Sequence, residues 1–388
     1  RAPPPPFASM QSSRNSGVVH CGIFYKPSSS YATLCVQGAK DLLARAERLG
    51  LPLRKCGKLV VATNSNRVGA HERLTALARQ ATSLGVPDLR VMSEQEVREL
   101  EPALSTAGAI LAPTSASIDF PSVAASLVAE AMDVPWSRLQ NERLLTTAGQ
   151  DTPVNGVRVL RSFPVTRIST GVSTTTLHSD GQPPVTGHTV IECAGMNADR
   201  LARDLGGART PGIIPVEGQW RVFQPSAAHL LSRHVYPLPD PNHPWLGVHF
   251  TARLNGDVWA GPNALVKPSR TTATFSLSDS LETVTTPGFA SFLARYAPSG
   301  VREFGGAWSD AAYLRRINEF LPTMKRQDLR PEREYGIRAL ALDPSGELEG
   351  NFVLERPHSS RLLVRNAPSP AATSCLAIGK RIAEEFRK

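Results

Sequence analysis

Apolar positions recur along the chain with two different spacings, and these predict both helices and strands. Helical spacing predicts helices over 31–49, 70–84, 122–132, 289–296, 306–320 and 371–386. The first two end at Gly50 and Gly85, and glycine is the usual residue just past a helix end. Ser93 and Glu96 have the spacing of a capping box, which predicts a further short helix before Pro102.

Short runs of apolar and β-branched residues predict strands between these helices. Strands or hairpins are predicted over 56–63, 165–168, 173–187, 188–192, 213–223, 234–240, 245–264 and 335–343. Asn255-Gly256 divides the 245–264 segment and is a strong signal for a tight hairpin. The mixture of strands and helices predicts an α/β (α+β) fold.

Composition and charge narrow the classes of function. The chain has 388 residues, of which 41% are apolar and 20% charged, as in an ordinary globular protein that can form two interleaved domains. The net charge is +9, but its lysines and arginines are scattered, which argues against nucleic acid and is compatible with small anions. We expect no transmembrane segment, because no apolar run has the required length. Five cysteines without a Cys-x-x-Cys pair argue against a disulfide framework and a zinc site.

The stretch SSRNSGVVHCGIFY, residues 12–25, is the strongest candidate for a cofactor site. Small polar residues and glycine let backbone N–H groups approach a planar or phosphorylated ligand closely. His20 follows them and could exchange protons. The alternative is a solvated turn followed by a hydrogen-bonded strand histidine.

Two further residues stand out because their chemistry does not suit their surroundings. Arg338 lies in the otherwise apolar strand YGIRALALD, where a buried charge is costly unless it meets an anion. That anion is either a ligand or the carboxylate of a structural ion pair. Strand alternation places His249 and Thr251 on one face, so His249 is either a pocket residue or an internally hydrogen-bonded one.

Six blocks of the sequence resemble FAD-dependent L-2-hydroxyglutarate dehydrogenases, within the D-amino-acid-oxidase-like flavoproteins. The motifs are SSRNSGVVHCGIFYKP, CGKL, HTVIECAGMNADRLARDLG, HVYPLPD with GVHFT, YGIRALALD, and RNAPSPAATS. The resemblance implies an FAD-binding Rossmann-like domain interleaved with an antiparallel-sheet substrate domain. The first would comprise residues 1–63, 102–212 and 331–388, and the second residues 64–101 and 213–330.

The sequence departs from this family at its beginning. A Rossmann-type FAD domain opens with a βαβ unit that carries Gly-x-Gly-x-x-Gly, and this fingerprint is not present in the chain. We therefore expect the first βαβ unit to be missing. The chain is either a piece of a longer protein, which the absent initiator methionine favours, or a shortened homologue.

The resemblance implies oxidation of L-2-hydroxyglutarate to 2-oxoglutarate by hydride transfer to FAD, without a metal. Arg338 would hold the substrate carboxylate, and His20 or His249 would be the base. Tyr25, Tyr236 and Arg253 are candidates for orienting the distal carboxylate. The cofactor-binding residues would be Ser12, Ser13, Arg14, Asn15, Ser16, Val165, Gly195, Asn366, Pro368, Ser369 and Ala371.

The expected partners are a small dicarboxylate and an unidentified electron acceptor, with a quinone or oxygen as candidates. By family analogy a eukaryotic member would be mitochondrial, although no targeting signal is readable in the chain. Two other functions compete. One is an amine-oxidising flavoprotein of the sarcosine or glycine oxidase type, and the other is a non-catalytic truncated remnant that binds no cofactor.

Overall fold

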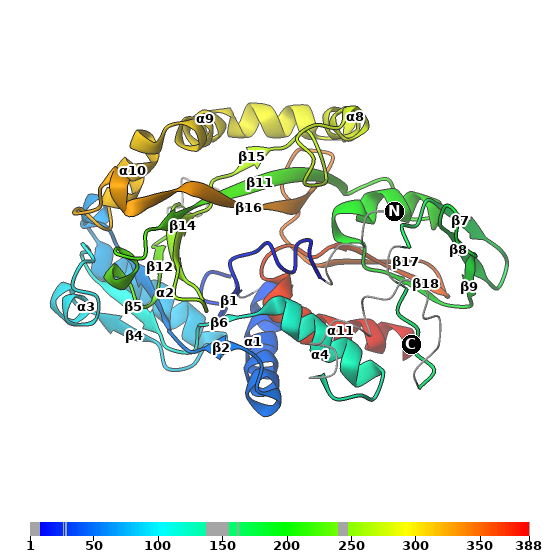
Figure 1. The fold of residues 1–388 in the computed structure, drawn as a ribbon, viewed down its shortest axis with the longest axis horizontal. Helices are drawn as coiled ribbons and strands as arrows, with labels where there is room; N and C mark the ends of the chain where they lie inside the picture. Colours follow the sequence, from blue (N-terminus) through cyan, green and yellow to red (C-terminus); the bar gives the residue numbers. More distant parts are fainter. Residues whose placement is uncertain are drawn as a thin grey trace.

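The computed structural model describes residues 8–25, 27, 29–136, 155–160, 163–239 and 247–387. Segment 240–246, into which two predicted strands extend, lies outside these residues, as does 137–154. Figure 1 shows a large sheet with helices along one side and smaller sheets at one end. The predicted mixture of helices and strands is thus confirmed.

A nine-stranded sheet forms the main scaffold. Its strands are β3 (Lys58–Val61), β4 (Arg90–Met92), β5 (Ala109–Ala112), β11 (Gly212–Phe223), β12 (His234–Pro237), β13 (His249–Ala252), β14 (Val258–Gly261), β15 (Leu265–Val266) and β16 (Leu329–Leu342). Their order is β15-β11-β14-β13-β12-β3-β5-β4, and β16 also pairs with β11. All pairs are antiparallel except β3 with β12. The sheet joins strands from both predicted domain ranges, and the division into domains stays a prediction.

The described residues also form three smaller sheets of three strands each. Their strands are β10 (Val190–Glu192), β17 (Val353–His358) and β18 (Arg361–Asn366); β7 (Arg167–Thr170), β8 (Thr175–His178) and β9 (Val185–Gly187); and β1 (Val18–Val19), β2 (Leu53–Arg54) and β6 (Ala116–Ile118). β10 and β18 are parallel. The predicted strand 165–168 begins two residues later, at Arg167.

Most predicted helices are present with nearly the expected ends. The α-helices are α1 (Ser30–Leu49), α2 (Ala70–Ser83), α3 (Glu94–Leu100), α4 (Phe120–Ala131), α7 (Ala198–Asp204), α8 (Leu277–Thr285), α9 (Phe289–Trp308), α10 (Asp310–Asn318) and α11 (Ala371–Arg387), and the 3-10 helices are Asn64–Asn66, Gly195–Asn197, Ala228–Leu230 and Arg326–Asp328. Gly50 closes α1 in the left-handed conformation, and the Ser93–Glu96 capping box is formed.

One predicted helix boundary is wrong. The sequence predicts a break between 296 and 306, but α9 continues to residue 308, and the break lies at Ser309, whose side chain caps α10. Pro298 and Gly300 disfavour a helix only locally. The buried rings of Phe289 and Phe292 pack in one cluster with Leu342 of β16, and this tertiary packing holds the helix.

The N-terminal segment lies between the large sheet and the pair of helices α1 and α11 (Figure 1). Thr373, in the first turn of α11, accepts a hydrogen bond from the backbone N–H of His20 at 3.1 Å and donates one to the carbonyl of Val18 at 3.3 Å. On the other side, a Cβ added at Gly336 of β16 would clash with the carbonyl of Arg14. Glycine at 336 therefore lets the loop before β1 lie directly on the sheet.

The described residues also bear on membrane spans, disulfides and metal sites. Within the described ranges, no helix has the combination of length and hydropathy needed to cross a membrane. The five cysteines are free, and Cys193 is exposed. The described side chains also include no group of three His, Cys, Asp or Glu residues suited to a metal ion.

Candidate functional site

One face of the nine-stranded sheet gathers polar side chains from strands far apart in sequence. In the β3–β12 pair, Lys58 lies opposite His234 and Val60 opposite Tyr236, so these side chains share a face. Tyr236 contacts His249 of the next strand on that face. We call His20, Lys58, Tyr236, His249 and Arg338 the sheet-face cluster.

The tyrosine at the centre of the cluster brings the two predicted bases together. The ring of Tyr236 lies 4.2 Å from that of His249, centroid to centroid, at 30° between planes. The ring of His20 lies 6.2 Å from Tyr236 in an edge-on arrangement. Phe24 stacks near Tyr236 at 6.2 Å and 19°. The sequence prediction that His20 and His249 belong to one site therefore has a geometric basis, although their roles stay predictions.

His249 is held in one tautomer. Its Nδ1 lies 3.0 Å from the carbonyl oxygen of Gly247, a distance at which Nδ1 carries the proton and donates it. In the neutral ring, Nε2 then carries no proton and is not used in the hydrogen bond to Gly247. Burial, together with the charges of Arg338 and Lys58, lowers the pKa of His249 to about 3. The imidazole is consequently neutral near pH 7, which leaves Nε2 as an acceptor, although the low pKa also makes it a weak base until a bound anion offsets the two positive charges.

The pKa of His20 is also held well below its ordinary value. Burial is the main cause, and the charge of Lys58 is the largest electrostatic one. The backbone N–H of His20 is bonded to Thr373, so the residue is fixed by the first turn of α11. Both histidines are thus neutral, and the choice between them stays open.

Arg338 is half-buried and reaches across β11. It lies opposite Val216, and its Nη2 lies 3.1 Å from the position that a Cβ would take on Gly218. Glycine at 218 therefore leaves room for the guanidinium. The positive charge of Arg338 contributes to the lowered pKa of His249 and is felt by Tyr236. The arginine thus lies at the cluster, and its role as a carboxylate clamp stays a prediction.

The two other predicted substrate residues have structural partners. Arg253 Nη1 donates to the carbonyl of Asn15 at 3.2 Å, and its guanidinium lies 4.1 Å above the ring of Trp259. Tyr25 packs against Tyr31, with ring centroids 5.7 Å apart, and burial raises its pKa. Arg253 therefore braces the opening loop against the sheet. The predicted role of Arg253 and Tyr25 in orienting the distal carboxylate of the substrate stays a prediction.

The opening loop is a built turn that ends beside the cluster. Asn15 Nδ2 donates to the carbonyls of Gln11 and Ser12 at 2.9 and 2.8 Å, and its Oδ1 accepts from Gly17 N–H at 2.7 Å. The side chains of Ser12, Ser13 and Arg14 are exposed, and Arg14 stacks over a tyrosine ring of β16. Ser16 lies beside the Tyr236 hydroxyl. The side chain of Asn15 thus stabilises the conformation of the loop itself. The role of the loop in cofactor binding stays a prediction.

The remaining predicted cofactor residues lie around β10, β18 and α11. Gly195 follows β10 with φ +55°, and an added Cβ there would meet nothing within 4 Å. Asn366 is buried and donates to the carbonyls of Glu349 and Asn351 at 3.1 and 2.8 Å, so its side chain is already used. The Pro368 carbonyl accepts from Ala371 N–H at 2.8 Å at the start of α11. Ser369 is exposed beside it, and Val165 precedes β7.

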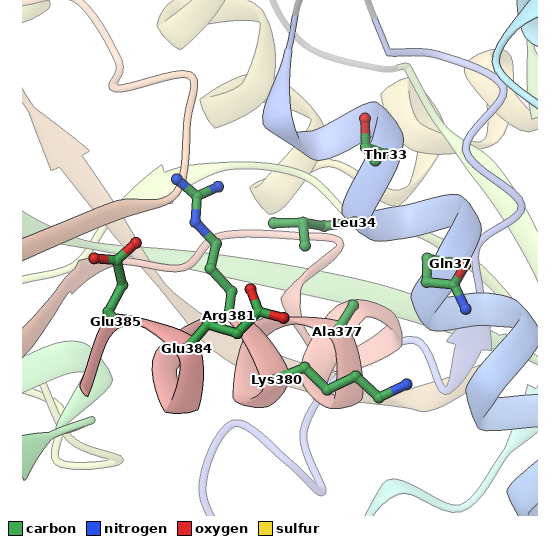
Figure 2. Close-up of a pocket in the computed structure, with 8 residues that line it drawn as sticks. All are labelled: Thr33, Leu34, Gln37, Ala377, Lys380, Arg381, Glu384 and Glu385. Atoms are coloured by element: carbon green, nitrogen blue, oxygen red, sulfur yellow. The ribbon is translucent and has the colours of Figure 1, made fainter. Parts of the chain in front are cut away.

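A pocket elsewhere on the molecule is not the site. It has a volume of about 440 Å³ and lies between α1 and α11 (Figure 2). Its lining residues are Thr33, Leu34, Gln37, Ala377, Lys380, Arg381, Glu384 and Glu385. The two cations and two acids offset each other, and no predicted site residue is among them.

The sequence interpretation missed three members of the site's surroundings. Lys58 is 1% exposed, and its Nζ lies 4.3 Å from the Tyr236 ring centroid. Phe24 and Thr251 border the same tyrosine. The signal for Lys58 was available, because a lysine that opens the apolar run KLVV is as unusual as an arginine in IRALAL.

The comparisons with known proteins decide the family. A sequence profile described as FAD dependent oxidoreductase matches residues 5–385. The chain belongs to the FAD-dependent oxidoreductase family. FAD is therefore its cofactor. The predicted membership and fold class are confirmed, while the absence of a first βαβ unit stays a prediction.

Relatives of this FAD-dependent oxidoreductase include three proteins named L-2-hydroxyglutarate dehydrogenase. The mitochondrial protein of Caenorhabditis elegans is 34% identical and is matched over 97% of this chain and 83% of its own length. The human mitochondrial protein is 32% identical, with 97% and 80% covered. That of Indibacter alkaliphilus is 31% identical, with 97% and 89% covered.

Solved structures show the same fold at lower identity. L-alpha-glycerophosphate oxidase from Mycoplasma pneumoniae, with FAD bound, has a TM-score of 0.70 and 20% identity over 98% of this chain and 86% of that one. Glycine oxidase from Geobacillus kaustophilus has a TM-score of 0.65 and 18% identity, with 98% and 85% covered. This likeness concerns the fold alone.

The residues of this FAD-dependent oxidoreductase fit a bound ligand at the cluster. The hydroxyls of Tyr236 and Thr251 are buried beside each other, yet neither has a hydrogen-bond partner with good geometry. Buried hydroxyls without partners are costly unless a ligand supplies them. The open turn at Gly195 leaves room for the close approach of a dinucleotide to the backbone.

Proposed function

We propose that this chain catalyses the FAD-dependent oxidation of L-2-hydroxyglutarate to 2-oxoglutarate. The observation that carries the proposal is a neutral histidine, His249, fixed in a proton-accepting tautomer within the same cluster as Arg338. Oxidation of a 2-hydroxy acid needs these two groups, one for the hydroxyl proton and one for the carboxylate. The names of the three relatives supply the substrate.

In the proposed reaction, Arg338 binds the C1 carboxylate of the substrate in a two-point contact. His249 Nε2 takes the proton of the C2 hydroxyl, and the Nδ1 bond to Gly247 stabilises the imidazolium that forms. The buried hydroxyls of Tyr236 and Thr251 orient the same substrate oxygen. FAD, when bound, accepts the hydride from C2.

His20 is the second candidate for the base. Its ring lies 6.2 Å from that of Tyr236, and its backbone N–H is bonded to Thr373 of α11. Its imidazole is neutral for the same reason as that of His249, namely burial near Lys58. His249 is preferred because its tautomer is fixed.

The residues proposed to hold FAD are the loop ending at Ser16, the Gly195 turn and the start of α11. Ser16 borders the cluster, so the reactive part of the cofactor would lie near Tyr236. Gly195 allows close approach of a dinucleotide to the backbone, and the first N–H groups of α11 suit the electron-rich edge of a reduced flavin.

The experiment is to mix the purified chain with FAD and record flavin absorbance during anaerobic addition of L-2-hydroxyglutarate. Bleaching by the L isomer, and not by the D isomer, is expected. Bleaching by glycine, sarcosine or L-proline instead would support the amine-oxidising alternative. Failure to retain any flavin would support the non-catalytic one. Amine-oxidising enzymes share only the fold with this chain, at 18% identity for glycine oxidase, so we do not prefer that function.

For the electron acceptor we propose only a chemical class, and for the protein's location in the cell only a compartment. The relatives from Caenorhabditis elegans and human are named as mitochondrial, and we propose the same location by analogy. A quinone or oxygen would reoxidise the flavin. Stopped-flow reoxidation by air-saturated buffer and by a short-chain quinone decides between them.

A further inference from the structure

Lys58 is a buried cation, and the described residues around it include no acid. Five lysine and arginine residues are buried in the described part of the chain. Four of them have a carboxylate partner: Arg45 with Glu130, Arg221 with Asp310, Arg270 with Asp199, and Arg365 with Glu355. Among the described residues, Lys58 is the one of these five without a carboxylate partner.

The groups around Lys58 are aromatic rings, histidines and thiols. Its Nζ lies 4.3 Å from the ring centroid of Tyr236 and 5.9 Å from that of Phe24. Ring faces attract a cation but do not neutralise it. Burial lowers the pKa of Lys58, and among the described residues the thiols of Cys21, Cys35 and Cys56 partly oppose this. Burying an ammonium group without an anion beside it is energetically costly, so an anion that binds there would be stabilised.

The lysine lies in the same cluster as the arginine proposed to bind the substrate. The charges of Lys58 and Arg338 both lower the pKa of His249, and both lie close to Tyr236. His249 is therefore under the influence of two cations, and the Lys58 ammonium lies 4.3 Å from the ring centroid of Tyr236. A hydroxy monocarboxylate would satisfy one of these cations, whereas a dicarboxylate would satisfy both.

We propose that Lys58 binds the second carboxylate of the substrate, and that it thereby selects dicarboxylic over monocarboxylic 2-hydroxy acids. This inference rests on the proposed function and adds the residue that determines its substrate class. An ammonium suits this role, because it meets a carboxylate at the end of a flexible chain as a point charge.

The test compares Lys58→Met, which keeps the length of the side chain and removes its charge, with the unchanged chain. The substrates are L-2-hydroxyglutarate and L-2-hydroxybutyrate, and the readout is the rate of anaerobic flavin reduction. Lys58→Met should lower kcat/KM for the dicarboxylate about 30- to 100-fold, the usual effect of losing a charged hydrogen bond. For the monocarboxylate the change should stay within about threefold, since that substrate lacks the second carboxylate. Lys58→Arg should retain most of the preference.

A binding measurement without turnover separates this inference from the proposed function. Glutarate and butyrate are titrated calorimetrically into both proteins, and only glutarate binding should depend on Lys58. If L-2-hydroxyglutarate is not oxidised but glutarate binding still depends on Lys58, the proposed function fails and the inference stands. Equal loss for both substrates, or no loss, would overturn the inference.

Two controls guard against a change in folding. Lys55→Met removes an exposed lysine three positions away and should leave both substrates and both ligands unaffected. The midpoint of thermal unfolding of Lys58→Met should be unchanged or raised, because an unpaired buried charge has been removed. A lower midpoint would show that the ammonium already has a structural role, which contradicts the inference. If Lys58→Met does not fold, Lys58→Gln is measured in its place.

Discussion

The Nδ1 atom of His249 lies 3.0 Å from the carbonyl oxygen of Gly247. This contact is local, since the two residues are two positions apart, but it decides which ring nitrogen is available for chemistry. The side chain stands on the sheet face where it meets Tyr236. A strand histidine can therefore be internally hydrogen-bonded and catalytic at once, and the two interpretations that the sequence set against each other are compatible.

The first prediction concerns the identity of the base. His249→Asn should lower the rate of flavin reduction by L-2-hydroxyglutarate about 100- to 10,000-fold, the range attributed to general base catalysis. His20→Asn should lower it about tenfold or less, through small changes in position. Stopped-flow absorbance under anaerobic conditions measures both. The reverse order would assign the base to His20. His71→Asn, on the exposed side of α2, is the matched control.

The second prediction concerns Arg338. Arg338→Lys keeps the positive charge but replaces a two-point contact with one point charge, so KM for L-2-hydroxyglutarate should rise at least about 30-fold. Steady-state kinetics with an artificial electron acceptor provides the measurement. Arg330→Lys is the control on the same strand, where the arginine pairs with Asp257 at 2.6 Å. An unchanged catalytic efficiency of Arg338→Lys would remove Arg338 from substrate binding.

The sequence predicted the elements of this fold better than their assembly. Local signals located α1 and its end at Gly50, the capping box at Ser93, and the hairpin between β13 and β14. These depend on backbone conformation and on neighbours within a few residues. α9 continues through Pro298, where the local pattern predicts a break, while Phe289 and Phe292 at its start pack against a strand that is distant in sequence. No local pattern contains that contact.

For the site, too, single residues could be predicted from the sequence, whereas the contacts between them could not. His20, His249 and Arg338 could be singled out because each is a titratable or charged residue in an apolar or glycine-rich setting. The contact of Tyr236 with His249 follows from the β12–β13 register, and its contact with His20 follows from the packing of the opening segment on the sheet, both of which only the fold provides. The segment with Lys58 is predicted only as a buried strand, although a charge within an apolar strand is the same signal that singles out Arg338.

The third prediction concerns stability at acidic pH. Burial and the charge of Lys58 lower the pKa of His234 to about 3, whereas the unfolded chain has the ordinary value near 6.5. Between these values the unfolded state binds more protons, so stability falls as the pH decreases through that window. Each such histidine contributes at most about 1.4 kcal/mol per pH unit.

The variant His234→Gln isolates one of these contributions. On going from pH 7 to pH 5, its loss in free energy of unfolding should be about 2 kcal/mol smaller than that of the unchanged chain. Urea unfolding at the two pH values provides the measurement. His71→Gln, an exposed substitution, should retain the full pH dependence. Identical pH slopes for all three proteins would mean that His234 is not held neutral by the fold.

The last prediction concerns the buried ion pair that joins α7 to the segment before α8. Arg270 Nη1 and Nη2 lie 2.5 and 2.9 Å from Asp199 Oδ1 and Oδ2, and both side chains are almost fully buried. Asp199 also accepts from the N–H of Ile213 at 3.1 Å, where β11 begins. Asp199→Asn would remove the close two-point carboxylate from the buried guanidinium and leave it only Glu282, 3.5 Å from Nη2, as an acid. The free energy of unfolding should therefore fall by about 3 to 5 kcal/mol. In contrast, Glu347→Gln breaks an exposed pair with Arg295 and should cost less than about 1 kcal/mol. Urea unfolding compares the two, and a loss below about 1 kcal/mol for Asp199→Asn would contradict the prediction. Since Arg270 and Arg338 are alike in type but differ in setting, this measurement also shows what a purely structural arginine contributes in this fold.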